Sequence, residues 1–311
     1  LTLLFGATGS TQLAEIGPAL AGTGLTDEPL VLAAMVLIGA GLAFKASVAP
    51  FHMWAPDVYE GAPTTVTAFM STATKAAAFA AFLRIFSGLF PDIQVDWGIA
   101  LAVLAVASIA VGNIAALVQD NMKRLLAYSS IAQAGYLLIG VATGTIEGAE
   151  AVIFYLLVYG VMTMAAFAVV ILREREVEDG ETIQSLAGYA RSRPLLGAVM
   201  TVAMLSLAGF PPLSGFVGKF MIFGSAVDAD MTWLAVVGAV GSIISLGYYL
   251  RVVAVIWLGG NERTLPHRIL GVPAAPGIVT VILGVAVIGL GLFASPVIDV
   301  CSGAAQALLA P

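Results

Sequence analysis

The chain has 311 residues, of which 60% are hydrophobic and only 10% are charged, and its formal net charge is −6. Soluble domains carry about a quarter charged residues, so this composition excludes a soluble globular enzyme and predicts an integral membrane protein. The acidic balance offers no basic surface, which argues against a partner made of nucleic acid.

The first residues, 1–10, read LTLLFGATGS and are predicted to be the end of a helix already under way. They begin without methionine, so we expect the sequence to be incomplete at its N-terminus. Eight apolar runs follow, each bounded by glycine, proline or charge and near or above the roughly 18 to 20 residues that cross a bilayer. They cover residues 29–54, 64–89, 98–118, 123–143, 149–172, 194–226, 231–258 and 275–300.

Lipid supplies no hydrogen-bond partners for the backbone, so a chain crosses a membrane either as helices or as a closed barrel. The runs show no alternation of apolar and polar residues over ten-residue segments, which a barrel requires. The predicted fold class is therefore an all-α polytopic membrane protein with about eight complete transmembrane helices in this chain.

The loops between the runs differ in charge in a regular way. Every second loop lacks lysine and arginine; their acidic residues are Glu15, Asp27, Glu28, Glu147, Glu150, Asp228 and Asp230. The alternate loops hold Lys123, Arg124, Arg173, Arg175, Arg191, Arg193, Arg263 and Arg268. Because lysine and arginine are retained on the cytoplasmic side, the second set of loops is predicted to be cytoplasmic.

Three lysines, Lys45, Lys75 and Lys219, fall within the apolar runs. A lysine at the centre of a membrane helix costs roughly 2.5 to 3.5 kcal/mol on insertion scales, so three of them need a reason. One reason is structural, an ion pair or a side chain that reaches the interface. The other is a proton site, because burial disfavours the ammonium form of a lysine and lets it exchange protons near neutrality.

Two of these lysines lie beside predicted helix breaks. Pro50 follows Lys45 by five residues, and the segment 209–212, Gly-Phe-Pro-Pro, precedes Lys219. Proline removes a backbone donor and clashes with the preceding turn, so each run is predicted to be two half-helices with an unwound middle. Ordinary proline kinks are the alternative, but paired broken segments in two halves of a chain are typical of a transport site.

Five motifs carry a resemblance to a known family. They read FKASVAPFHMWAPDVYEGAPTTV, TATKAAAFAAFLRIF, NMKRLLAYSSIAQAGYLLIG, LAGFPPLSGFVGKF and GYYLRVV. In order and spacing they resemble the antiporter-like membrane subunits of respiratory complex I, the proton-pumping NADH:quinone oxidoreductase. The PDVYEGAP and GYYLRVV segments look most like the N-subunit type, called subunit 2 in mitochondria.

The resemblance implies an antiporter-like inverted-repeat helix bundle with two broken helices. Residues 1–311 would form a single membrane domain, with 29–89 the remainder of the first repeat, 98–258 the second repeat and 275–300 the C-terminal helix. In the family's order of fourteen helices, the present runs would be the seventh to the fourteenth.

The same resemblance assigns roles to the lysines. Lys45 would be a modulated proton acceptor, Lys75 a central relay, and Lys219 the donor or acceptor on the exit side. The family's glutamate partner for the first lysine lies on its fifth helix, which this sequence does not contain. Several relatives carry a histidine where this chain has Gln133, and a glutamine holds water but does not titrate.

Other polar residues are candidates for the proton path. His52 is a possible relay, since its unperturbed pKa is about 6.5, or it satisfies carbonyls freed at the break. Tyr128, Ser129 and Ser130 either hold water along the path with Gln133 or join neighbouring helices. We expect Tyr248 and Tyr249, a pair on the 231–258 run, to serve packing and interfacial anchoring.

The resemblance places the redox chemistry elsewhere. NADH, FMN, iron–sulfur clusters and quinone would belong to other subunits of the complex, and we expect no cofactor and no metal in this chain. The sequence itself lacks CxxC pairs, HExxH and phosphate-binding loops. The expected partners are other membrane-arm subunits, the lipid bilayer and protons, in the inner (plasma) membrane of a bacterium, which the chain would cross several times.

Two alternatives stay open from the sequence. Multisubunit sodium/proton antiporters use similar lysines on similar helices, and only the finer motifs argue against them. A structural membrane subunit, whose lysines fix helix packing, is the other alternative.

Overall fold

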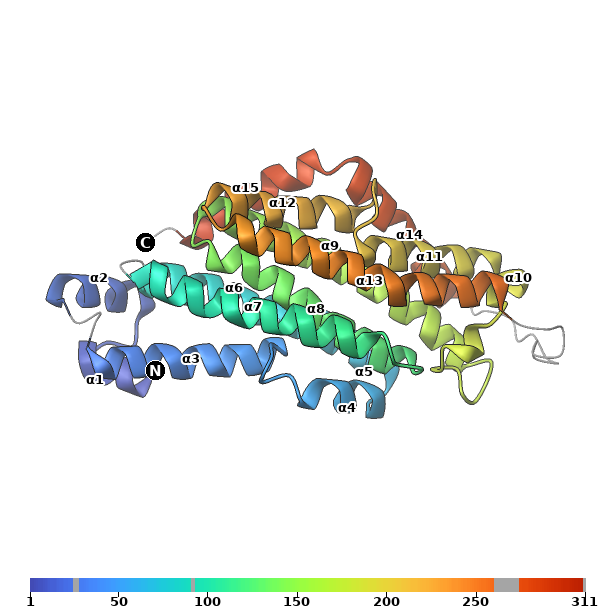
Figure 1. Cartoon of the computed structure of the whole chain (residues 1–311), viewed down its shortest axis with the longest axis horizontal. Coiled ribbons are helices and arrows are strands. Elements are labelled where there is room, and N and C mark those ends of the chain that lie inside the picture. The colour runs from blue at the N-terminus through green and yellow to red at the C-terminus, as the bar shows by residue number, and fades with distance from the viewer. Residues whose placement is uncertain (25–27, 91–92, 260–273, 310–311) are drawn as a thin grey trace.

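The computed structural model describes residues 1–24, 28–90, 93–259 and 274–309. Helices make up almost all of this part of the chain, and most run along the long axis of the molecule (Figure 1). Among the described residues, 7 helices are long and apolar enough to cross a membrane. They are α3 (Pro29–Ala46), the stretch Thr64–Ser87, α7 (Gln94–Ala116), α8 (Met122–Ala142), α9 (Ile146–Glu174), α13 (Thr232–Leu258) and α14 (Ala274–Leu292). The predicted all-α membrane fold is confirmed.

The first predicted break is present and is held by side chains. Helix α3 ends at Ala46, and α4 (Trp54–Gly61) follows, so the broken span continues beyond the predicted end at residue 54. Pro50 has no N–H to bond the carbonyl that ends α3. The Ala49 N–H instead donates to the Ser108 hydroxyl on α7 at 2.9 Å, which anchors the irregular segment against a neighbouring helix.

The next span contains two wide turns. Helix α5 (Thr64–Phe69) passes through the π-helical turn η2 (Met70–Thr74) into α6 (Lys75–Phe82), and a second π-helical turn, η3 (Leu83–Ser87), completes it. A π-helical turn adds a residue to the normal helical period, shifts the side chains that follow it and is frequent at functional sites. The turn η2 sets the direction of Lys75, the residue that follows it.

The second predicted break divides the run 194–226. Helix α11 (Pro194–Ala208) is followed by its C-cap residue, Gly209, which has a φ of 87° in the left-handed region. Helix α12 (Ser214–Asp228) begins after the two prolines. Glycine adopts this conformation without steric cost, so it is the residue that lets the chain turn out of α11.

Two helices differ from the prediction. The run 275–300 is not one helix: α14 ends at Leu292 and α15 (Ser295–Leu309) follows. Pro296 lacks the N–H that would bond the Leu292 carbonyl, yet it is tolerated in the first turn of a new helix. At the N-terminus, α1 (Thr2–Thr8) lies within the predicted helical segment, whereas α2 (Leu13–Thr23) occupies a stretch that was predicted as a loop.

Helix α8 forms the core of the bundle, and almost all of its side chains are buried. It packs against α7, α9, α12 and α13 and against α4. The approach of α7 is close because Gly112 has no side chain: a Cβ there would lie 2.5 Å from the Ala132 nitrogen. Ser129, Ser130 and Gln133 of α8 are therefore enclosed by the neighbouring helices.

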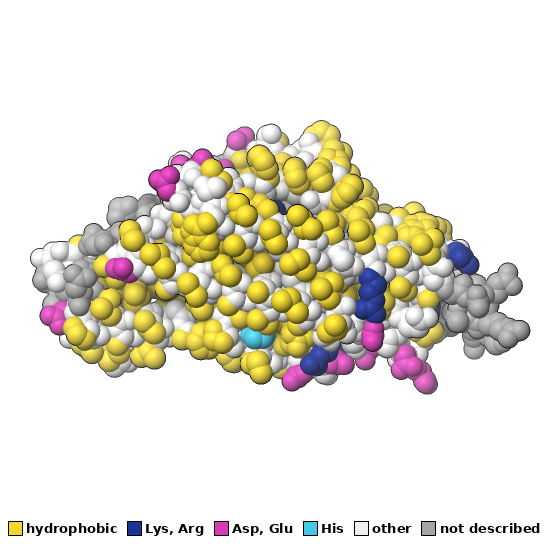
Figure 2. Space-filling view, in the orientation of Figure 1, with side chains coloured by type: hydrophobic (Ala, Val, Ile, Leu, Met, Phe, Trp, Pro, Cys, Tyr) yellow, Lys and Arg dark blue, Asp and Glu magenta, His cyan; other side chains and the backbone are white. Residues whose placement is uncertain are grey.

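Apart from the lysines within the spans, most charge lies away from the apolar middle of the bundle. Figure 2 shows hydrophobic side chains over the middle of the molecule, with most charged side chains toward its two ends. The acidic loops and the Lys/Arg-containing loops lie at opposite ends, as the alternation of charge predicted (Figure 1). Asp27, Arg263 and Arg268 lie outside the described residues.

The loop after α9 is folded rather than extended. It contains the short helices η5 (Gln184–Leu186) and α10 (Tyr189–Ser192). Glu176 accepts from Arg173 at 3.2 Å and from Arg193 at 3.0 Å, and the Glu176 carboxylate is only 6% exposed. A buried carboxylate between two guanidinium groups holds the loop against the end of α9.

We predict that Glu176→Ala lowers the melting temperature of the purified protein in detergent. Removing one partner of a buried ion pair costs about 3 to 5 kcal/mol because it leaves charge uncompensated. The neighbouring Asp179→Ala, an exposed carboxylate, is the control and is expected to change nothing. Equal melting temperatures for the two variants would contradict this account of the loop.

Candidate functional site

The polar residues of α8 form the centre of a buried network. Ser129, Ser130 and Gln133 are at most 2% exposed, and each one has side-chain partners on neighbouring helices. Buried polar groups are stable only when they are hydrogen-bonded, so these contacts determine how the helices pack.

Lys75 is the first lysine of this network. Its ammonium donates to the Ser130 hydroxyl at 2.6 Å and to the Ser130 carbonyl, and it lies 5.4 Å from the centre of the Tyr159 ring on α9. The Tyr159 hydroxyl also donates to the Ser130 hydroxyl oxygen, at 3.0 Å. Lys75 is 2% exposed, and no carboxylate among the described residues forms an ion pair with it. Neutral hydrogen-bond acceptors and an aromatic face are its only compensation, which is typical of a lysine that exchanges a proton.

Lys219 is held by the break between α11 and α12. In a helix, the N–H groups of residues 211 and 212 would bond the carbonyls of Leu207 and Ala208, but both of these positions are proline. The Lys219 ammonium donates to those two carbonyls at 3.0 and 3.2 Å. The two prolines thus create the acceptors that stabilise a lysine in the membrane interior.

Two further contacts complete the surroundings of Lys219. The ammonium donates to the Ser242 hydroxyl on α13 at 2.9 Å and lies 4.6 Å from the centre of the Tyr136 ring on α8. The side chain is 3% exposed. The environment matches that of Lys75 in kind: hydroxyl and carbonyl oxygens, one aromatic face, and no carboxylate within ion-pair distance among the described residues.

Gln133 connects the two lysines. Its Nε2 donates to the Leu207 carbonyl at 3.1 Å, and Lys219 donates to that same carbonyl. Nε2 also lies 3.2 Å from the Tyr249 hydroxyl, while Oε1 accepts from the Tyr155 hydroxyl at 2.5 Å. Both N–H groups of the amide are therefore used by groups on two other helices, and its oxygen, bonded to Tyr155 on a third, keeps one free lone pair.

The link to Lys75 runs through adjacent serines. The Tyr249 hydroxyl lies 2.5 Å from the Ser129 hydroxyl, and the next residue, Ser130, accepts from Lys75. Polar contacts therefore extend from Lys75 to Lys219 over Ser130, Ser129, Tyr249, Gln133 and the Leu207 carbonyl, and only the step between the two serines is covalent.

Three of the predicted site residues lie outside this network. Lys45 is on the exposed face of α3 and makes no hydrogen bond or ion pair within the described parts of the chain. His52 is half-buried, and its Nδ1 has no hydrogen-bond partner among the described residues. Tyr128 is half-buried at the charged end of α8, with its ring 5.9 Å from the Arg124 guanidinium.

The aromatic part of the network was not predicted from the sequence. Tyr155 and Tyr159 are four residues apart on α9, a spacing that places both side chains on one face of a helix. Tyr248 and Tyr249 were expected to serve packing and interfacial anchoring. Both are buried, which agrees with packing, and both are also hydrogen-bonded: Tyr248 donates to Asn113 at 3.0 Å. Four tyrosines in apolar helices were the signal, because a buried hydroxyl needs a partner.

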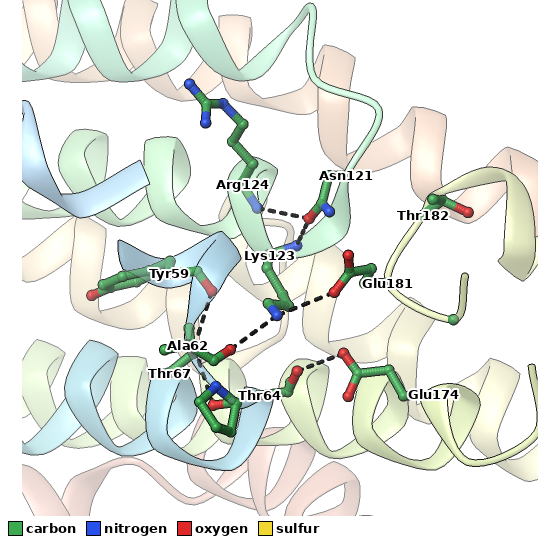
Figure 3. A network of polar contacts seen from close by, with 12 residues as sticks. Tyr59, Ala62, Thr64, Thr67, Asn121, Lys123, Arg124, Glu174, Glu181 and Thr182 are labelled. Atoms are coloured by element: carbon green, nitrogen blue, oxygen red, sulfur yellow. Dashed lines mark hydrogen bonds and ion pairs between the residues drawn. The ribbon is translucent and has the colours of Figure 1, made fainter. Parts of the chain in front are cut away.

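A second polar cluster lies at the Lys/Arg-rich end of the bundle (Figure 3). Lys123 donates to the Ala62 carbonyl at 3.0 Å and to Glu181 at 3.1 Å. The Thr64 hydroxyl donates to Glu174 at 2.5 Å. Arg124 also pairs with Asp57 and Glu60 on α4, so this cluster fixes the second half of the broken span against α8 and α9.

Comparison with known proteins gives a consistent result. The family profile described as "NADH:quinone oxidoreductase/Mrp antiporter, TM" matches residues 1–245. NADH-quinone oxidoreductase subunit N of Salinibacter ruber is 47% identical over an alignment 311 residues long, which covers 97% of this chain and 62% of the relative. The subunit N of Trichlorobacter lovleyi is 48% identical over 263 residues, which cover 85% and 54% of the two chains. The chain thus spans about three fifths of the length of such relatives.

Solved structures show the same fold. A chain of respiratory complex I from Thermus thermophilus superposes with a TM-score of 0.79 at 41% identity, covering 96% of this chain and 63% of the other. A chain of the Mrp complex from a Dietzia species superposes with a TM-score of 0.87 at 28% identity, covering 100% and 64%.

We predict that Gly209→Ala disturbs the Lys219 site. An alanine pays about 1 to 2 kcal/mol for the left-handed backbone, and its Cβ would lie 3.1 Å from the Lys219 Cδ. The melting temperature in detergent should fall. Gly224→Ala on α12 has open space and ordinary helical backbone, so it serves as the control and should hold or raise the melting temperature. A Gly209→Ala protein as stable as Gly224→Ala would contradict the expected strain.

Proposed function

Because the chain belongs to the NADH:quinone oxidoreductase/Mrp antiporter transmembrane family, we propose that it translocates protons as an N-type subunit of the membrane arm of NADH:quinone oxidoreductase. The observation that supports this function best is the connection between Lys75 and Lys219. Two buried lysines that form no ion pair within the described part of the chain, joined by hydroxyl and amide groups, are an arrangement suited to proton transfer across a membrane.

The transfer proceeds in three steps along the network. Lys75 gives its proton to water at the Ser130 hydroxyl, and the hydroxyls of Ser129 and Tyr249 pass it on. Gln133 does not titrate, so it positions water rather than carrying the proton itself. Lys219 receives the proton beside the Leu207 carbonyl and releases it on the far side of the membrane.

The driving force is electrostatic. An ammonium in the membrane interior is stabilised or destabilised by charges that approach or leave it, and its proton affinity changes accordingly. Lys45 is the proposed receiver of such a change, because its exposed position on α3 leaves it open to a carboxylate from outside this chain. His52, half-buried in the break beyond Lys45, is a further possible relay at this position.

The redox reaction belongs to other subunits in this proposal. NADH oxidation, FMN, the iron–sulfur clusters and quinone reduction lie outside this chain, which acts as a translocase. Residues 29–89 are the remainder of the first repeat of the bundle, and residues 98–258 are the second repeat. The end with Lys123 and Arg173 faces the cytoplasm, and the membrane is the plasma membrane of a bacterium.

A sodium/proton antiporter is the second candidate. The higher TM-score, 0.87, belongs to the Mrp complex, whereas the higher sequence identity, 41%, belongs to complex I. Fold similarity does not separate two activities on one fold, so the identity and the relatives named subunit N favour the first candidate. Transport that requires sodium and proceeds without NADH would favour the second.

We predict that Lys75→Ala lowers the number of protons translocated per NADH while the complex still assembles. Without the amine, proton transfer through this chain should slow by about 100-fold or more, a typical loss for a missing acid–base group. Lys75→Met keeps the side-chain volume and should behave in the same way. Measurements on proteoliposomes with the intact complex test this, and an unchanged ratio removes Lys75 from the path. Loss of assembly in both variants would instead indicate a structural role for the lysine.

A further inference from the structure

The last span is also broken, and its break lies against the break between α11 and α12. Helix α14 ends at Leu292 and α15 begins at Ser295, and α14 packs against both α11 and α12 (Figure 1). Leu292 and Phe293 are 56% and 74% exposed, so they face outward at this break. Gly291, one residue earlier, faces inward, onto residues 212–214, where α12 begins.

The two breaks meet backbone to backbone. A Cβ on Gly291 would lie 2.7 Å from both the Leu213 carbonyl carbon and the Ser214 nitrogen, and closer still to the Pro212 carbonyl oxygen. Carbon atoms pack best at about 3.5 to 4.0 Å, so any side chain at this position must displace one of the two segments. Gly291 therefore sets how closely α14 approaches the start of α12, because glycine alone permits backbones to come this near.

The start of α12 determines the geometry at Lys219. The lysine lies on α12, whereas its two carbonyl acceptors, Leu207 and Ala208, are the last residues of α11. The donor–acceptor distances of 3.0 and 3.2 Å therefore depend on how the two half-helices are placed relative to each other. A hydrogen bond is lost when donor and acceptor are about 3.6 Å apart, so a shift of roughly half an ångström between the half-helices is enough to break these contacts.

One side chain joins the two half-helices directly. The Ser206 hydroxyl, which precedes Leu207 in the chain, accepts from the Gly215 N–H at 3.0 Å and lies 3.3 Å from the Ser214 hydroxyl. Both serines are fully buried. Ser214 is thus in contact with α14 through Gly291 and with α11 through Ser206.

We propose that Gly291 and Ser206 are positioning residues for proton transfer at Lys219. The close approach at Gly291 and the Ser206 contact together fix the start of α12. That position keeps the Lys219 ammonium at its two carbonyl acceptors. Because α14 contains no titratable residue, its contribution is geometric. The proposal rests on the proposed function and adds the last span to the elements that shape the Lys219 site.

Three variants of the intact complex, reconstituted in proteoliposomes, test this role. Gly291→Ala adds the Cβ that has no room. Gly289→Ala lies on the same helix, with nothing within 4 Å of its Cβ, and is the matched control. Ser206→Ala removes the contact between the half-helices without adding volume. Gly291→Ala and Ser206→Ala are also combined with Lys219→Met, because a residue that acts through Lys219 has no further effect once the amine is gone.

We expect Gly291→Ala and Ser206→Ala each to lose most of the protons per NADH that Lys219→Met loses, and nothing more when combined with it. Uncoupled NADH oxidation and the Gly289→Ala ratio should stay at the unsubstituted level. A purely structural role predicts lower melting temperatures with unchanged ratios in the assembled complexes. That result would overturn the proposal and leave the proposed function standing, as would an equal fall in Gly289→Ala or a further fall in the combined variants.

The remaining outcomes are also decisive. If Gly291→Ala does not assemble, a lowered ratio in Ser206→Ala that depends on Lys219 supports the positioning role, and an unsubstituted ratio overturns it. An unchanged ratio in only one of the two assembled variants would remove that residue from the role. A wild-type ratio in Lys219→Met would overturn the proposed function, and the positioning role with it.

Discussion

Two carbonyl groups without backbone donors determine the interior of this protein. Pro211 and Pro212 cannot bond the carbonyls of Leu207 and Ala208, and lipid offers no water to do so. Lys219 satisfies both carbonyls, and in return they stabilise an ammonium that would otherwise be costly to bury. The helix break and Lys219 therefore stabilise each other: the ammonium satisfies the two free carbonyls, and the carbonyls compensate the buried charge.

The rest of the network follows from this pair of acceptors. The Leu207 carbonyl has a second lone pair, which Gln133 occupies, and Gln133 in turn orders Tyr155 and Tyr249. The close approach of α7 at Gly112 and the surrounding helices exclude lipid from the middle of α8, so its serines bond to protein groups. At the other end of the network, the Lys75 ammonium is stabilised in a similar way, by the Ser130 hydroxyl and the Tyr159 ring.

Local patterns predicted much of this arrangement, and tertiary contacts account for the rest. Hydropathy and proline positions predicted the membrane helices, both breaks and the burial of Lys75 and Lys219, because these properties depend on a few neighbouring residues. The division of the last run at Leu292 was missed, although Pro296 was visible. The joining of Gln133 to Leu207 and Tyr249 was not predictable, because it depends on which faces of three helices meet. Lys45 lies on an exposed face of α3 among the described residues, and its role as a proton acceptor stays a prediction.

The central claim is that Lys75 and Lys219 act as one path through Gln133. The most direct measurement is the proton-to-NADH ratio of the reconstituted complex carrying Gln133→Leu, at a temperature where the variant is folded and assembled. Leucine has a similar size but cannot join the Leu207 carbonyl to Tyr249 or hold water between them. The account predicts intact uncoupled NADH oxidation with a lowered ratio, close to that of a Lys219→Met variant. A ratio equal to that of the unsubstituted complex would show that protons do not pass between the two lysines by this route.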